Sequence, residues 1–134
     1  MRRRCPSAVF SSKAILREYR LAFPLLSKRW DGGVAGIIAD KEEIVEGVVY
    51  KISEEDLKRL DKFENVDKGT YYRKKIRVIL DDGFSTEAWT YFPNPDAKSL
   101  FSPSQRYLRT IRKGAEEHKL SQQFINKLRH IDKK

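Results

Sequence analysis

The stretch ISEEDLKRLDKFENVDKGTY, residues 52–71, says the most about how this chain folds. Ser53 is followed three residues later by Asp56, which resembles a capping box with an aspartate in place of the usual Glu or Gln. A serine in this position offers its oxygen to the free N–H groups of a first helical turn. The pattern therefore predicts a helix that begins at Ser53.

The same stretch places an acidic residue at the inner end of an apolar stripe. Leu57, Leu60 and Glu64 lie at i, i+3 and i+7, so they share one helix face, and the two leucines indicate that this face is buried. Burial disfavours a charged carboxylate, so a glutamate in this position can exchange protons at neutral pH. Glu64 is therefore a candidate general acid–base.

An alternative interpretation gives Glu64 a structural role. A helix that ends at Phe63 would leave Glu64 in a solvated turn, or paired with Arg73 or Lys74. Structural ion pairs also perturb carboxylates. The residues of this stretch leave both interpretations open.

Strands are predicted on both sides of this helix, where apolar and polar residues alternate. Turn residues separate them, most clearly the hairpin turn at 81–83. Two further helices are predicted near the C-terminus, one running from Ser104 to Lys119 and a last one capped by Ser121. The expected strands are 8–14, 19–23, 34–38, 44–52, 72–80 and 84–92.

Strands followed by helices are typical of an α+β protein. We expect one domain over residues 1–134, because a chain of 134 residues buries roughly two thirds of its unfolded surface in one core. The many short strands predict a small antiparallel or mixed β-barrel, closed or nearly closed, with flanking helices packed outside.

The charge of the chain is strongly basic, with a formal net charge of +9. Lys and Arg dominate both ends, whereas acidic residues dominate residues 31–70. A basic surface attracts nucleic acid through counterion release. No nucleic-acid recognition motif accompanies the charge, so a basic nucleic-acid-binding module is the less favoured alternative and such partners are not expected.

Other compositional features argue against several classes of protein. The one cysteine, Cys5, excludes an internal disulfide and is compatible with the cytoplasm, where we place the chain. No apolar run is long enough to cross a bilayer, so no membrane association is expected. The histidines His118 and His130 lack metal-site spacing, and we expect neither a metal nor a cofactor.

A set of short motifs extends from residue 4 to residue 115. In order and spacing together, this set resembles the gamma-glutamylcyclotransferase (AIG2-like) family over nearly the whole chain. The motifs are RCPSA (4–8), WDGGVA (30–35), VEGVVY (45–50), LD (60–61), ENV (64–66), GTY (69–71), WTY (89–91), SPSQRY (102–107) and GA (114–115).

The resemblance implies an activity and a site. Glu64 matches the family's catalytic acid–base, and Tyr71, Tyr91 and Tyr107 match tyrosines that line its substrate pocket. The reaction implied is cyclisation of a small γ-glutamyl amine or dipeptide to 5-oxoproline, with release of the amine or amino acid. Without the resemblance, each tyrosine would be assigned to core packing with a locally bonded hydroxyl.

The family pattern is incomplete at the N-terminus. The family begins with a strand running into a Tyr-Gly-Ser-Asn loop that wraps the substrate, and these 134 residues contain no such tetrapeptide. We therefore expect an N-terminally incomplete domain with an open sheet edge. Such a chain would be weakly active, and either poorly stable or paired with a second copy as a homodimer. A family member that binds ligands without turnover is the second alternative.

Overall fold

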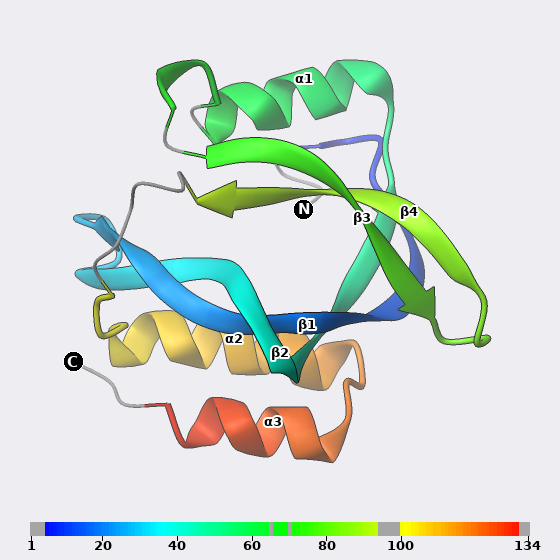
Figure 1. Cartoon of the computed structure of the whole chain (residues 1–134). Coiled ribbons are helices and arrows are strands. Elements are labelled where there is room, and N and C mark those ends of the chain that lie inside the picture. Colours follow the sequence, from blue (N-terminus) through cyan, green and yellow to red (C-terminus); the bar gives the residue numbers. More distant parts are fainter. Residues whose placement is uncertain (1–4, 65, 70, 94–99, 132–134) are drawn as a thin grey trace.

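The computed structural model describes residues 5–64, 66–69, 71–93 and 100–131. These residues form a four-stranded antiparallel sheet in the order β2-β1-β3-β4, together with helices. Helix α1 lies beside β3 and β4, whereas α2 and α3 lie beneath β1 and β2 (Figure 1). The elements are β1 (Val9–Ser27), β2 (Gly32–Lys51), α1 (Glu54–Phe63), the short 3₁₀ helix η1 (Val66–Lys68), β3 (Tyr71–Leu80), β4 (Ser85–Pro93), α2 (Gln105–Glu117) and α3 (Gln122–Arg129).

The first half of the sheet is one long hairpin, with pairing from Val9 opposite Lys51 to Ser27 opposite Gly32. The prediction of four short strands here was wrong, because β1 and β2 each run through the expected breaks. One register shift falls around Glu18, whose φ is 68°. Such a bulge bends a strand and increases its twist without ending it.

The α+β class and the antiparallel sheet are confirmed, but the predicted closure into a barrel is wrong. Strands β1 and β3 share only two residue pairs, Ala14 with Leu80 and Ile15 with Ile79. Backbone pairing in the sheet ends at β2 and β4, so these are the outer strands of an open sheet. A cavity of ≈ 740 Å³ lies between α1 and these outer strands, with Leu57 and Tyr91 in its lining.

The predicted C-terminal helices are confirmed, and they cover the long hairpin. Helix α3 contributes Phe124, Ile125 and Leu128 to a buried cluster that also packs against Leu21 of β1 and Val45 of β2. Ser121 caps α3 as predicted, because its Oγ accepts a hydrogen bond from the backbone of the third residue beyond it. None of the helices in the described part of the chain has the length and apolar character of a membrane span.

The segment before α2 packs closely against the long hairpin. Gly33 N–H donates to Ser102 O at 2.9 Å, and Phe101 N–H donates to Phe23 O at 2.9 Å. A side chain at Gly33 would meet the backbone of Phe101. The glycine therefore allows this segment to approach, and the approach places the first turn of α2 beside β2.

Candidate active site

Helix α1 begins and ends where its sequence provides caps. Ser53 Oγ accepts from Asp56 N at 3.1 Å, as the capping pattern predicts. Leu60 is buried, and the helix ends at Phe63. Glu64 is the C-cap residue and its N–H donates to Leu60 O at 2.9 Å. The alternative interpretation is therefore correct about the helix end at Phe63. Its solvated turn is not observed, because Glu64 is half-buried.

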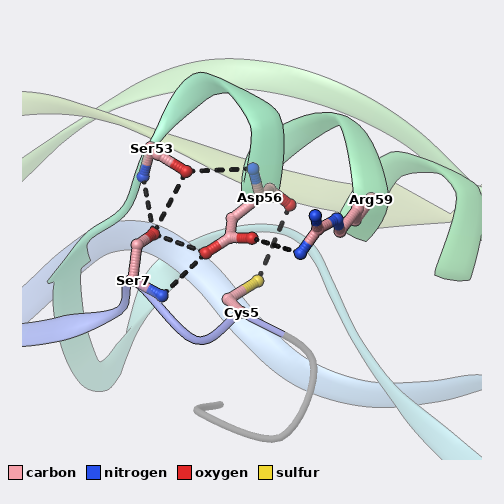
Figure 2. A network of polar contacts seen from close by, with 5 residues as sticks. All are labelled: Cys5, Ser7, Ser53, Asp56 and Arg59. Atoms are coloured by element: carbon pink, nitrogen blue, oxygen red, sulfur yellow. Dashed lines mark hydrogen bonds and ion pairs between the residues drawn. The ribbon is translucent and has the colours of Figure 1, made fainter.

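A buried carboxylate at the start of α1 anchors this helix to the N-terminal segment (Figure 2). Asp56 is 4% exposed and accepts from Ser7 N at 2.8 Å and from Ser7 Oγ. Ser7 Oγ in turn accepts from Ser53 N, and Arg59 forms an ion pair with Asp56 at 3.2 Å. The hydrogen bonds from Ser7 are the main cause that lowers the pKa of Asp56.

Cys5 completes this anchor. Its side chain is fully buried, and its thiol donates to Asp56 O at 3.7 Å. It packs with Ala8 and Leu60 in a small core under α1, which Tyr91 also touches. Cys5 is therefore a packed small residue of this core.

Two of the predicted tyrosines meet at a single residue of β2. Tyr71 Oη donates to Ala35 O at 3.1 Å, and Ala35 N donates to Tyr107 Oη at 2.8 Å. Tyr71 begins β3 and Tyr107 lies in the first turn of α2, whose start is capped by Ser104. The fold thus brings together two hydroxyls that are far apart in the sequence.

Glu64 lies close enough to act electrostatically on two of these tyrosines. Burial raises the pKa of Tyr71 to about 12, and the Glu64 carboxylate and Tyr107 add to that rise. Burial also raises the pKa of Tyr91, with a smaller contribution in the same direction from Glu64. A nearby negative charge disfavours the phenolate, so the Glu64 carboxylate acts on both tyrosines in the same direction as burial.

Tyr91 has a different partner, which the sequence reasoning missed. Its Oη donates to Asp61 Oδ1 at 2.6 Å, and the same oxygen lies 3.4 Å from Arg73 Nε. The spacing of Asp61 and Glu64, one helical turn apart, was the available signal, because residues at i and i+3 share a face. The sequence pattern indicates Arg73 as a partner of Glu64 and not of Asp61.

Tyr71 and Tyr107 thus share the backbone of Ala35, whereas Glu64 acts electrostatically on Tyr71 and Tyr91. Of the four, Tyr91 borders the ≈ 740 Å³ cavity. A pocket common to all four, with Glu64 as its acid–base, stays a prediction. Within the described ranges, His, Cys, Asp and Glu side chains nowhere gather in threes as around a metal ion.

Comparison with known proteins agrees with this architecture. A model of the AIG2-like family matches residues 44–128. Gamma-glutamylcyclotransferase of Mus musculus is 32% identical over 133 residues, which cover 96% of this chain and 70% of that protein. The Bos taurus protein of the same name is 34% identical with the same coverage.

The fold of the chain also matches that of a solved structure. A solved structure of a protein named gamma-glutamyl cyclotransferase has a TM-score of 0.93 and 29% identity, covering 99% of this chain and 80% of that one. Motifs, fold and extended sequence identity thus lead to one conclusion: the chain belongs to the AIG2-like family.

Proposed function

We propose that this chain cyclises a γ-glutamyl amine or dipeptide to 5-oxoproline and releases the amine or amino acid. The observation that carries the proposal is the position of Glu64, a half-buried carboxylate whose charge acts on Tyr71 and Tyr91. The names of the relatives, gamma-glutamylcyclotransferases, support the same reaction.

The reaction needs one group that moves a proton twice. The α-amine nitrogen of the substrate attacks its own γ-carbonyl carbon, a ring C–N bond forms, and the C–N bond to the leaving amine breaks. The attacking nitrogen loses one proton before it attacks and a second as it becomes the ring amide, and the leaving nitrogen gains two protons as it departs as an ammonium ion. Glu64 would take each proton from the attacking nitrogen and deliver it to the leaving nitrogen.

Positioning supplies much of the remaining rate. The attack is intramolecular, so the protein has mainly to hold the substrate in a bent conformation in which the reacting atoms are close. We assign this task to Tyr71, Tyr91 and Tyr107, which would line the substrate pocket. The scheme asks for no metal and no cofactor.

The test is the Glu64→Gln variant, because glutamine has nearly the same shape but cannot exchange the proton. Release of 5-oxoproline from a panel of γ-glutamyl dipeptides and amines should fall by about 100-fold or more. Glu55→Gln is the matched control, since Glu55 is an exposed residue of the same helix. Its turnover should equal that of the wild type.

Two outcomes would count against the proposal. Full turnover by Glu64→Gln would eliminate the acid–base role. A wild-type chain that binds γ-glutamyl compounds but releases no 5-oxoproline would favour the alternative of a family member acting as a binding protein.

We also propose a cytoplasmic location and a homodimer. Cys5 is the one cysteine of the sequence, so it cannot form an internal disulfide, and this suits a reducing compartment. The outer strands β2 and β4 present sheet edges that favour pairing with a second copy. Light scattering coupled to gel filtration measures the mass in solution, and a monomer at all concentrations would contradict the dimer.

A further inference from the structure

Asp61 connects three elements at the edge of the candidate site. Its Oδ1 accepts a hydrogen bond from Tyr91 Oη at 2.6 Å and lies 3.4 Å from Arg73 Nε. The guanidinium carbon of Arg73 lies 4.4 Å from the centre of the Trp89 ring. One carboxylate on α1 is thus held by a cation from β3 and a hydroxyl from β4, and the cation rests on an aromatic ring.

The surroundings of this group differ from those of an ordinary surface ion pair. The side chains of Asp61 and Arg73 are 23% and 26% exposed. Arg77 of β3 and Glu87 of β4 form such a surface ion pair. Their side chains are 63% and 57% exposed, and Arg77 Nη2 lies 3.9 Å from Glu87 Oε1. Partial burial reduces screening by water and salt, so the Asp61 carboxylate keeps its partners in a defined geometry.

The hydrogen bond determines what Tyr91 can do for a ligand. A tyrosine hydroxyl has one hydrogen, and a bond to a carboxylate is among the strong ones. With that hydrogen given to Asp61, Tyr91 Oη can only accept from a further partner. It would therefore receive an N–H group and would not donate to a carboxylate or carbonyl.

We propose that Asp61 is a positioning residue that holds Tyr91 as a hydrogen-bond acceptor for the α-amine of the substrate. This inference rests on the proposed function and deepens it, because it assigns amine recognition to one tyrosine. Glu64 removes a proton from the same amine in the proposed reaction, and its charge reaches Tyr91. Asp61 acts through Tyr91 and does not itself touch the reacting atoms.

The first experiment follows the Tyr91 hydroxyl by NMR titration of ¹³C-labelled tyrosine, assigned with Tyr91→Phe. The bond to Asp61 favours the neutral phenol, so it contributes to the raised pKa of Tyr91. Asp61→Asn should therefore let Tyr91 titrate at lower pH than in the wild type. Glu87→Gln, which removes a carboxylate from the same strand pair, should leave that titration unchanged.

The second experiment separates positioning from a general structural effect. Asp61→Asn should lower kcat/KM by about tenfold, chiefly through a higher KM, since one oriented hydrogen bond to substrate is lost. The double variant with Tyr91→Phe should be no slower than Tyr91→Phe alone, within about twofold, because both changes remove the same interaction. Asp61→Glu keeps the carboxylate and should recover part of the activity.

Specific results would overturn the inference. An unchanged Tyr91 titration in Asp61→Asn, or losses that multiply in the double variant, would show that Asp61 does not act through Tyr91. If Asp61→Asn does not fold, Arg73→Gln replaces it, and loss of this cation should move the Tyr91 titration to higher pH. If the wild type releases no 5-oxoproline, the proposed function fails, while the titration still decides whether Asp61 orients Tyr91.

Discussion

Replacing Gly33 by alanine should separate the segment before α2 from the long β1–β2 hairpin. A Cβ at this position would lie 2.6 Å from Phe101 O and 2.8 Å from Phe23 Cβ. Real Cβ atoms essentially never come closer than 3.0 Å to such neighbours. Both neighbours are tied to the backbone and cannot rotate away, so the backbone itself must move.

The size of the effect follows from that movement. Ordinary contact begins at 3.4 Å, so Phe101 must retreat by the difference between 2.6 and 3.4 Å. The same retreat weakens the two 2.9 Å hydrogen bonds that hold the segment, from Gly33 to Ser102 and from Phe101 to Phe23. Overpacking costs about 1–3 kcal/mol and each bond about 0.5–1.5 kcal/mol, which gives a loss of roughly 2–6 kcal/mol.

Thermal unfolding followed by circular dichroism measures this loss. For a chain of 134 residues, each kcal/mol corresponds to about 3–4 °C in Tm, so Gly33→Ala should melt roughly 6–24 °C below the wild type. Gly47→Ala is the matched control, because Gly47 lies in the same strand and its Cβ would meet nothing within 4 Å. This control should be neutral or more stable by about 0.5–1 kcal/mol.

Equal melting of the two alanine variants would refute the reasoning, since it would mean that the Gly33 contact is not close-packed. A destabilised Gly33→Ala should also disturb the first turn of α2. Tyr107 lies in that turn and accepts a hydrogen bond from Ala35. Its NMR resonances should therefore shift more in Gly33→Ala than in Gly47→Ala.

Two further predictions concern stability. Lys119 follows α2 with φ 56°, and the bond from Leu120 N to Ala115 O closes a Schellman motif there. Lys119→Gly should therefore raise the free energy of unfolding by about 1 kcal/mol in urea titration, and a loss of stability would contradict it. Hydrogen bonds from Ser7 hold the folded-state pKa of Asp56 below its ordinary value. The ionised Asp56 carboxylate therefore stabilises the folded chain above the unfolded-state pKa, and this stabilisation is lost as pH falls through the folded-state pKa. Asp56→Asn should be less stable than the wild type at pH 7, with a gap that closes in acid; a gap independent of pH would contradict this.

Local features were read correctly because they depend on neighbours in the chain. Ser53 and Ser121 cap their helices as predicted, each through a bond to the third residue beyond it. Ser104, predicted as the first residue of its helix, caps α2 in the same way. The turn at 81–83 likewise joins β3 to β4. A cap or a tight turn is satisfied within about four residues, so the pattern that predicts it is complete in the sequence.

The sheet could not be read in the same way. A register shift near Glu18 lets β1 continue where alternation is interrupted, and only pairing with β2 reveals this. The open edge depends on β1 meeting β3 at just two residue pairs. Both features are set by how hairpins cross in space, which hydrophobic alternation along one strand does not encode.

The candidate site likewise combines features that the sequence predicts with features that depend on the tertiary structure. The sequence alone was enough to single out Glu64 and Tyr71, Tyr91 and Tyr107, through helical spacing and the motifs of a family to which the chain belongs. Only the tertiary structure placed Tyr71 and Tyr107 on Ala35, residues 36 and 72 positions away from it. Likewise, only the tertiary structure shows that the Tyr91 hydroxyl donates to Asp61. Hydrogen-bond partners from different elements are selected by packing and not by separation along the chain.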